Sequence, residues 1–444
     1  MKSPLSQKTL LLFLGDIVVL YAALLLALII RYGSGWQDVL DLHLVPFTIV
    51  FLLWLIVFYV AGLYDLRRLK NNITFLSLLS VSLAFNVLIT IALFYFISAF
   101  GIAPRATLSI LVIVFVILEL LWRRFFNARL GHAANLFNVL MVGDDPTIQE
   151  LTATLRKDPQ IGYKVAFHIQ GTHDLKAVEQ LEILLRAKGI DVVVVPHGAK
   201  QNVELQKIFY DLLASGIAVY DVPAFYEEVF RKIPLKNVEE SWFLEHISAR
   251  RNVYDDLKRV GEMVIAFAIG LILLPLIALV ALLVRFTSRG PAIFSQERVG
   301  LQNKNFTLYK FRTMVVNAER NGVQWASKND PRVTLLGRFL RYTHLDELPQ
   351  LWNILRGDLS FVGPRPERPE FVAMLEKEIP YYDIRHLITP GVTGWAQINY
   401  RYGASVEDSF EKLQYDIYYL KNRSLILDIA VILKTLRTLF VNAS

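Results

Sequence analysis

Four long apolar stretches at the start of the chain decide what kind of structure it can form. They cover Thr9–Ile30, Leu44–Leu63, Phe75–Phe100 and Ala106–Trp122. A helix needs about 20 apolar residues to cross the hydrocarbon layer of a membrane, and each stretch approaches that length. The first stretch is too long for the core of a signal peptide, and no convincing cleavage site follows it. The sequence therefore predicts a bundle of four transmembrane helices over residues 1–130.

The basic residues around these stretches predict the orientation of the bundle. They gather before the first stretch, after the second and after the fourth, as Lys2, Lys8, Arg67, Arg68, Lys70, Arg123, Arg124 and Arg129. The two remaining loops carry single basic residues, Arg31 and Arg105. Because lysine and arginine favour the cytoplasmic side of a membrane, both ends of the bundle are predicted to lie in the cytoplasm.

Two acids, Asp16 and Glu119, lie within the apolar stretches. An acid inside a membrane is costly and often functional. A structural pairing with Arg105 or with a tyrosine would explain both residues at least equally well, so the sequence leaves the two explanations open.

The composition agrees with a membrane protein. Of the 444 residues, 54% are hydrophobic, and the mean hydropathy of +0.40 is high for a soluble protein of this size. The absence of cysteine excludes disulfides, thiolate catalysis and cysteine-ligated metals. A net charge of +7 could indicate nucleic-acid binding, but no helix-turn-helix, zinc-finger or RNA-binding signature is present. We therefore expect no nucleic-acid partner and attribute the basic residues to the membrane surface and to phosphate binding.

Residues 137–235 follow a different pattern. Short β-rich runs, Val139–Gly143 and Val192–Pro196, alternate with helical stretches such as Thr147–Lys157 and Val203–Gly216. Alternation of this kind predicts a small Rossmann-like α/β domain on the cytoplasmic side.

The first turn of this α/β domain reads Gly143-Asp144-Asp145-Pro146. A dinucleotide site needs several glycines there so that the backbone can approach the pyrophosphate. One glycine and two acids that would repel phosphate make such a site unexpected. Dimerisation or regulation is the expected role, and the protein is expected to be a homodimer.

The most informative chemical signal is the block Asp346-Glu347-Leu348-Pro349-Gln350, which lies between Arg341 and the turn Gly363-Pro364-Arg365-Pro366. Two adjacent carboxylates framed by arginines suit a site that attacks a phosphorus centre and holds phosphate oxygens. Because proline favours the first helical position, the two acids are predicted at or just before a helix N-terminus. Taken alone, the pair could also be a solvated acidic helix start without any function.

Further motifs accompany this block in order along the chain. They are Lys258-Arg259, Phe294–Gly300 (FSQERVG), Tyr309–Met314 (YKFRTM), Ser360–Pro366 (SFVGPRP) and Pro390–Gln397 (PGVTGWAQ). With them, the region from about Leu257 to Ser444 resembles the monotopic phosphoglycosyltransferases, also called bacterial sugar transferases. The first half resembles the long form of this family, in which four spanning helices precede a Rossmann-like module.

The first half also resembles membrane-bound nucleotide-sugar dehydratases, which share those two parts. Those enzymes need a glycine fingerprint and a Tyr-x-x-x-Lys pair. Tyr254 and Lys258 have the spacing of the pair, but no glycine fingerprint precedes them. The sequence therefore does not support a dehydratase.

The resemblance to the sugar transferases implies a reaction and its site. A hexose 1-phosphate would pass from a UDP-sugar to a polyprenyl phosphate such as undecaprenyl phosphate, releasing UMP, as the first membrane step of surface polysaccharide synthesis. Asp346 is the candidate nucleophile, which would form an aspartyl-phosphosugar intermediate. Asp346 and Glu347 would hold Mg²⁺, a cation that prefers oxygen ligands and phosphates. Asp346 is expected to be ionised because cations surround it.

The candidate phosphate-binding residues are Lys310, Arg312, Arg341, Arg365 and Arg401. Arginine binds phosphate oxygens with two parallel hydrogen bonds, whereas lysine acts as a point charge. A solvated surface arginine would explain Arg401 about equally well. None of these motifs distinguishes one UDP-sugar from another.

A fifth apolar segment, residues 260–284, decides where the catalytic domain (residues 250–444) lies. Lys258 and Arg259 precede this segment and further arginines follow it, so both of its ends favour the cytoplasmic side. Pro275 would bend a helix beyond the middle of the segment. The sequence predicts a re-entrant helix that enters and leaves through the cytoplasmic face of the bacterial inner membrane, although the family usually has Ser-Pro where Leu274-Pro275 stands here. The alternative is an ordinary spanning helix, which also tolerates proline.

Together these patterns predict a membrane α plus α/β protein in three parts. Two other functions remain open at this point. One is a membrane scaffold or chain-length regulator with an inactive transferase domain. The other is a glycosyltransferase that moves the sugar alone and releases UDP.

Overall fold

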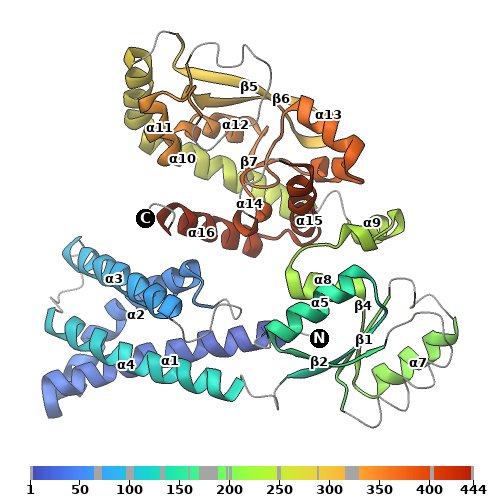
Figure 1. The fold of residues 1–444 in the computed structure, drawn as a ribbon. Helices are drawn as coiled ribbons and strands as arrows, with labels where there is room; N and C mark the ends of the chain where they lie inside the picture. The colour runs from blue at the N-terminus through green and yellow to red at the C-terminus, as the bar shows by residue number, and fades with distance from the viewer. Residues whose placement is uncertain are drawn as a thin grey trace. The chain divides into compact units, whose positions relative to one another are not determined.

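The structure is a computed structural model. It describes residues 4–64, 73–96, 105–130, 136–158, 161–169, 189–196, 199, 203–247, 252–287, 290–315, 330–400 and 405–441. The chain divides into two compact units, Met1–Phe230 and Arg231–Ser444 (Figure 1). Each unit is described by itself.

The described parts of all four predicted N-terminal apolar stretches lie in helices, except Gly62 and Leu63, which follow the end of the second helix. The helices are α1 (Pro4–Tyr32), α2 (Trp36–Ala61), α3 (Ile73–Phe96) and α4 (Arg105–Leu130). The apolar run Thr9–Tyr59 extends over α1 and α2 for 51 residues, about 76 Å of helix and over twice the hydrocarbon thickness. This run does not form one straight helix: α1 and α2 pack on each other, and the Tyr21 and Thr48 hydroxyls lie 2.9 Å apart. Four membrane crossings stay a prediction.

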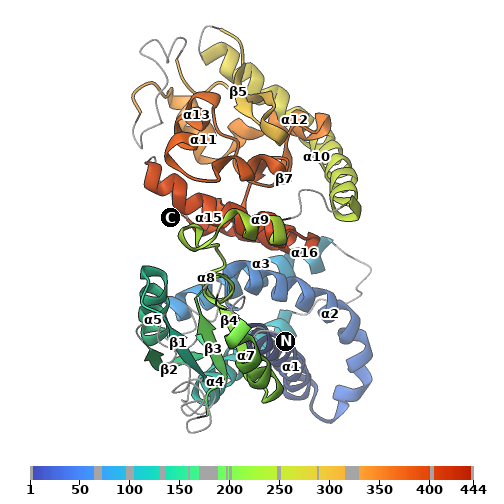
Figure 2. The same cartoon turned by 90° about the vertical axis from the view of Figure 1, so that its right-hand side faces the viewer.

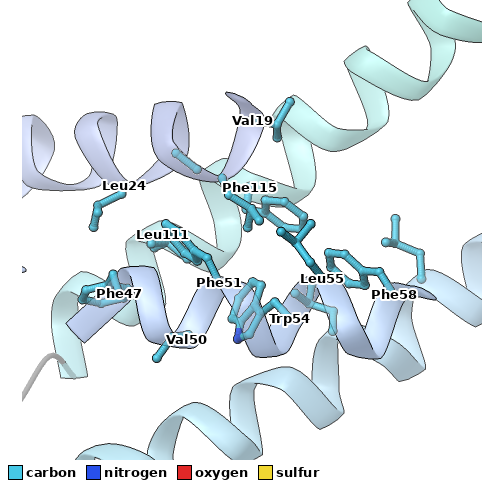
Figure 3. Packing of buried hydrophobic residues seen from close by; sticks show 14 of the residues in the cluster. Val19, Leu24, Phe47, Val50, Phe51, Trp54, Leu55, Phe58, Leu111 and Phe115 are labelled. Carbon is cyan, nitrogen blue, oxygen red and sulfur yellow. The ribbon is translucent and has the colours of Figure 1, made fainter. Parts of the chain in front are cut away.

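Aromatic side chains fill the centre of this bundle (Figure 3). The Phe115 ring on α4 stacks on Phe58 at 5.8 Å and meets the edge of Trp54 at 5.7 Å. The Trp54 indole donates a hydrogen bond to Thr90 on α3 at 2.9 Å. The apolar stretches therefore pack on one another as well as offering apolar faces to the outside.

The two acids within the apolar stretches share one buried arginine. Arg123 on α4 lies 2.5 Å from the Asp16 carboxylate and 2.6 Å from the Glu119 carboxylate. It also donates to the Leu63 carbonyl just beyond α2 at 2.9 Å. A buried charge needs such partners, and this cluster joins α1, the end of α2 and α4. The structural explanation of the acids thus has direct geometric support, with Arg123 as their partner.

A parallel four-stranded sheet follows the bundle. Its strands are β1 (Phe137–Val142), β2 (Tyr163–Ile169), β3 (Val192–Val195) and β4 (Ala218–Asp221), in the order β2-β1-β3-β4. Helices α5 (Pro146–Lys157) and α8 (Val222–Phe230) pack on one face, and α7 (Val203–Ala214) packs on the other (Figure 1). Alternate residues of each strand point to opposite faces, so Val193 meets α7 while Val192 and Val194 meet α5 and α8. The α/β pattern is confirmed at this level, and a Rossmann-like domain stays a prediction.

In the turn that follows β1, the side chain of Asp145 caps the N-terminus of α5. The Asp145 carboxylate accepts hydrogen bonds from the Thr147 and Ile148 amides at 2.8 and 3.1 Å. These amides begin α5 and would otherwise be available to an anion. The geometry therefore agrees with the expectation that no dinucleotide binds here.

The second unit combines several short helices with two small sheets. Its helices are α9 (Glu240–His246), α10 (Asn252–Thr287), α11 (Leu335–Tyr342), α12 (Gln350–Arg356), α13 (Pro369–Glu378), α14 (Trp395–Asn399), α15 (Val406–Asn422) and α16 (Leu425–Val441). Strands β5 (Ile293–Val299) and β6 (Asn305–Phe311) pair antiparallel, and β7 (Ser360–Val362) pairs parallel with β8 (Gly391–Thr393). These elements, together with the turns and loops that join them, carry the family motifs quoted above.

The segment 231–247 packs into the core of the second unit. Ile233, Trp242 and Phe243 are buried in one cluster with Val299, Ile417 and other residues of this unit. The Trp395 indole donates to the Arg231 carbonyl at 2.9 Å. The compact unit therefore begins earlier in the chain than the fifth apolar segment.

Helix α10 carries the fifth apolar segment and is continuous through Pro275. It lies along one edge of the unit beside α12 (Figure 2). Ala266 packs with Leu308 and Ile354 in the first half of α10, and Val280 and Val284 pack with Phe311 and Leu340 near its end. The apolar side chains between these contacts are mostly exposed: Phe267, Leu271, Ile272 and Leu274. The re-entrant turn stays a prediction, but both ends of α10 contact the same unit.

Candidate active site

The acidic pair lies in a tight turn between α11 and α12. Asp346 and Glu347 form a single 3₁₀ turn with Leu345. His344 precedes this turn with φ 55°, a left-handed conformation that reverses the chain after α11. Pro349 stands directly before α12, one residue earlier than the first helical position predicted for it. The acids thus lie just before a helix N-terminus, as the sequence indicates.

Glu347 is held by two cations. Its Oε1 atom lies 2.7 Å from the Lys310 ammonium and 3.5 Å from the Arg365 guanidinium. Burial alone would raise the pKa of Glu347, but the charges on Lys310 and Arg365 outweigh burial and lower this pKa to about 2. Glu347 is therefore ionised throughout the physiological range.

Asp346 has a different environment. It is only 8% exposed, and no residue in the described part of the chain donates a hydrogen bond to its carboxylate. Burial and the neighbouring Glu347 charge raise its pKa above the ordinary value, while Lys310, His344 and Arg341 act in the opposite direction. The cations that were expected to keep Asp346 ionised are therefore present, but burial works against them. A carboxylate without hydrogen bonds keeps both oxygens available for bonding to another group.

Lys310 reaches the acids from strand β6. This strand is joined to α12 by Asn353, which is fully buried. The Asn353 side chain accepts from the Tyr309 amide at 3.1 Å and donates to the Thr307 carbonyl at 2.7 Å. Sequence reasoning missed Asn353, although a single polar residue within Leu351–Leu355 was the signal. The neighbouring Arg312 is buried just beyond the end of β6.

Arg341 comes from α11 and is anchored on the other side. Its Nε atom donates to the Thr313 hydroxyl at 2.9 Å. The Thr334 hydroxyl caps α11 by accepting from the Gly337 amide at 2.9 Å. A Cβ atom at Gly337 would overlap the Thr313 carbonyl, so only glycine allows α11 to approach this closely. The charge of Arg341 acts on Asp346.

Arg365 reaches the acids from a loop that follows β7. We call residues 363–368 the Arg365 loop. Gly363 lies against the Thr389–Gly391 backbone, where no Cβ atom would fit. The structure therefore brings together Asp346 and Glu347, which share one turn, and three cations from separate parts of the fold: Lys310, Arg341 and Arg365. Arg401 lies outside the described residues.

The side chains of Lys258 and Arg259 form polar contacts with other residues of the second unit. Lys258 donates to the Val362 carbonyl at 2.7 Å and to the Tyr419 hydroxyl at 2.8 Å, and it lies 3.0 Å from Asp428. Arg259 donates to the Ile354 carbonyl at the end of α12 at 3.0 Å, a position where a cation stabilises the helix. These two residues thus attach the start of α10 to the elements that carry the site.

Comparison with known proteins identifies a family whose model covers the residues of this site. The family model described as bacterial sugar transferase matches residues 253–442. UDP-glucose:undecaprenyl-phosphate glucose-1-phosphate transferase from Escherichia coli (strain K12) is 32% identical over 333 residues, which cover 70% of this chain and 69% of that protein. The chain belongs to the bacterial sugar transferase family.

Two further bacterial sugar transferases match over a shorter share of their length. UDP-N-acetylgalactosamine-undecaprenyl-phosphate N-acetylgalactosaminephosphotransferase from Aeromonas hydrophila is 39% identical over 224 residues, 50% of this chain and 52% of that protein. Undecaprenyl-phosphate glucose phosphotransferase from Komagataeibacter xylinus is 35% identical over 283 residues, 61% of this chain and 52% of that protein. The chain thus spans about half the length of these two relatives. The names of the three relatives include two different sugars.

Proposed function

We propose that this protein transfers a hexose 1-phosphate from a UDP-sugar to a polyprenyl phosphate and releases UMP. The carboxylate of Asp346 is the observation that carries the proposal. It is buried, accepts no hydrogen bond from the described residues and lies beside an ionised glutamate within a group of cations. A solvated acidic helix start would have none of these properties. The names of the relatives support undecaprenyl phosphate as the acceptor.

The proposed reaction has two displacements at one phosphorus atom. A carboxylate oxygen of Asp346 attacks the phosphorus that carries the sugar, and the bond from that phosphorus to the bridging oxygen breaks. UMP leaves with the electron pair, and an aspartyl phosphate that carries the sugar remains. An oxygen of the polyprenyl phosphate then attacks the same phosphorus and displaces the Asp346 carboxylate. Neither step requires a proton if both attacking oxygens are ionised.

The cations around the dyad suit the charge that moves in these steps. Arg341 and Arg365 can each present two parallel N–H groups to phosphate oxygens. Lys310 holds Glu347 and adds a positive charge beside Asp346. Fixed charges of this kind stabilise a transition state without having to reorganise.

The donor set fits Mg²⁺ together with substrate phosphates. Among the described residues no group of three or more His, Cys, Asp and Glu could hold a metal ion. Mg²⁺ commonly binds through one or two carboxylates and completes its shell with phosphates and water. Asp346 and Glu347 would be the protein ligands, and the bound cation would neutralise charge on the diphosphate.

We further propose that this chemistry takes place at the cytoplasmic face of the inner membrane. From Lys258 to Val284, α10 would be about 39 Å long if straight, more than the hydrocarbon thickness. A helix that crossed the membrane would carry its two ends to opposite surfaces. Lys258 and Arg259 near the start of α10, and Val280 and Val284 near its end, all contact the same unit. These contacts support a placement of both ends on one side of the membrane, and we propose that the helix, which is continuous here, bends at Pro275 in the lipid.

A comparison of Asp346→Asn with the wild type tests the nucleophile. We expect the wild type to release UMP from at least one UDP-sugar and to gain the mass of a hexose phosphate on the peptide containing Asp346. Asp346→Asn keeps the shape but removes the nucleophile, so the adduct should disappear and turnover should fall at least about 10³-fold. The measurement is UMP release together with mass spectrometry of the digested protein.

Asp358→Asn is the matched control, because Asp358 pairs with Arg356 at the end of α12 and should leave turnover unchanged. Full turnover by Asp346→Asn would remove Asp346 from the nucleophile role. Release of UDP in place of UMP would identify a glycosyltransferase that moves the sugar alone. No release of either nucleotide would favour an inactive scaffold.

A further inference from the structure

The Arg365 loop is held by its backbone carbonyls. Every carbonyl from residue 364 to residue 367 accepts a hydrogen bond. The donors are the Gly391 amide to Pro364 at 2.8 Å, Arg385 to Arg365 at 2.9 Å, Arg298 to Pro366 at 3.0 Å and the Val299 amide to Glu367 at 2.9 Å. Prolines 364 and 366 have no N–H group and therefore cannot donate hydrogen bonds to these carbonyls. Two arginine side chains from elsewhere in the fold supply donors instead.

Arg385 is built into the protein interior. Its side chain is 7% exposed and lies 2.9 Å from the Asp416 carboxylate on α15, which is 3% exposed. It also donates to the Tyr382 hydroxyl at 2.6 Å. From the sequence, Arg385 is only a weak candidate for phosphate binding, and a solvated surface arginine would explain it about equally well; the structure buries it. Its polar contacts lie within the protein, so Arg385 does not touch a substrate.

The carbonyl that Arg385 holds belongs to the residue whose side chain reaches the dyad. The Arg365 side chain is 43% exposed and lies 3.5 Å from Glu347. A long, half-exposed side chain has many rotamers, so the placement of its backbone decides how often it reaches the acids. We propose that Arg385, oriented by Asp416, is a positioning residue that fixes the backbone of Arg365 so that its guanidinium lies at the dyad. The inference rests on the proposed function only for the role of Arg365 toward substrate phosphate.

The side-chain type matters at this position. The planar guanidinium donates hydrogen bonds to the Tyr382 hydroxyl and to the Arg365 carbonyl, and it forms an ion pair with Asp416. Lysine would keep the positive charge beside Asp416 but could not reproduce this fixed geometry. Arg385→Lys therefore removes the positioning contact without leaving a buried carboxylate unpaired.

The test measures kcat and KM for a UDP-sugar in full-length Arg385→Lys protein. A hydrogen bond from a charged donor corresponds to a change of about tenfold or more. We expect KM to rise by about that factor, while the fraction of protein that forms the Asp346 adduct at saturating UDP-sugar stays near the wild-type value. A purely structural role would lower the amount of active protein and leave KM unchanged, and that result would overturn the proposal.

A double-mutant cycle with Arg365→Ala decides whether Arg385 acts through Arg365. If it does, Arg385→Lys should change kcat/KM by less than about twofold once the Arg365 side chain is absent. Multiplication of the two separate losses would contradict the proposal. Arg356→Lys is the control, because Arg356 is 53% exposed and pairs with Asp358, and it should behave as the wild type.

Amide hydrogen exchange separates this inference from the proposed function, because it needs no activity. The peptide that covers the Arg365 loop should exchange faster in Arg385→Lys than in the wild type, and Arg356→Lys should leave it unchanged. Unchanged exchange in Arg385→Lys would overturn the positioning role, whatever the reaction. A wild-type protein that releases no UMP would overturn the proposed function alone.

Discussion

At the residue scale, the two adjacent acids differ because they meet different neighbours. Glu347 touches Lys310 and Arg365, and its pKa is lowered to about 2. Asp346 is buried and accepts no hydrogen bond from the residues that the structure describes, and its pKa is raised. Pairs of titratable groups with opposite pKa shifts commonly take separate roles in one site. Here Glu347 suits permanent charge and metal binding, whereas Asp346 suits bond formation.

His386 gives a pH-dependent prediction at the same scale. It is buried, and burial together with Arg385 lowers its pKa from 6.5 to about 3. The unfolded chain binds this proton below about pH 6.5 while the folded protein does not, so stability should fall as the pH falls from about 6.5 to about 3. The slope from one such group is up to about 1.4 kcal/mol per pH unit. We expect His386→Phe, which cannot bind the proton, to flatten this part of the pH profile of thermal unfolding.

Arg356→Lys is the control for this experiment. Arg356 is 53% exposed and pairs with Asp358, and lysine keeps its positive charge. The pH profile of this variant should match that of the wild type. A profile for His386→Phe as steep as that of the wild type would show that other groups cause the pH dependence.

At the scale of elements, the long apolar helix α10 is bonded to the elements that carry the site. The start of α10 is bonded to β7 and α12 through Lys258 and Arg259, and its end packs on α11. Glu262 on α10 accepts from the Ser360 hydroxyl at 2.6 Å and from the Phe361 amide at 3.0 Å. The same helix that carries an exposed apolar surface therefore fixes the strand from which the Arg365 loop begins.

Cysteine labelling tests the placement of α10, and the cysteine-free chain makes single-site labelling clean. Val253, Ile272 and Phe286 are 82%, 75% and 83% exposed. Val253→Cys and Phe286→Cys should both react with a membrane-impermeant thiol reagent from the cytoplasmic side only. Ile272→Cys should be protected from both sides, because lipid covers it. Reaction of the two end positions from opposite sides would establish a spanning helix.

At the scale of the whole molecule, the transferase unit takes its first residues from the segment that follows the α/β sheet. Ile233 and Trp242 are buried with Val299 and Ile417, and the Ile233 amide donates to the Gln414 carbonyl at 3.1 Å. The family model, by contrast, begins at residue 253. The connection between the α/β domain and the catalytic elements is therefore part of a packed core.

Fragments test this boundary. A fragment of residues 231–444 should be recovered folded from detergent, whereas a fragment of residues 250–444 should be less stable or aggregate, because it exposes the apolar surface that 233–243 covers. Thermal unfolding and size-exclusion chromatography of the two fragments measure the difference. Equal stability of both fragments would show that the segment 231–247 is dispensable.

Composition and short-range patterns were enough to predict the apolar helices and the alternation of strands and helices, and to recognise the family motifs. They suffice because helix formation depends on residues three or four apart and a lipid-facing surface must be apolar. The predicted helix start at the dyad was accurate to one residue for the same reason. The Asp145 cap likewise follows from residues adjacent in the chain.

The ion pairs of the site, by contrast, are visible only in the three-dimensional structure. Lys310, Glu347 and Arg365 come from β6, the 3₁₀ turn and the Arg365 loop, and residues 37 positions apart form the shortest of their ion pairs. Asn353 stands out in the sequence as a lone polar residue in an apolar run, and Arg385 is a weak candidate for phosphate binding. Neither pattern reveals the role of the residue, because that role depends on partners 20 or more positions away in the chain. Arg123 likewise joins Asp16 across 107 positions. Such pairings depend on how elements pack in three dimensions, which no local pattern of residues contains.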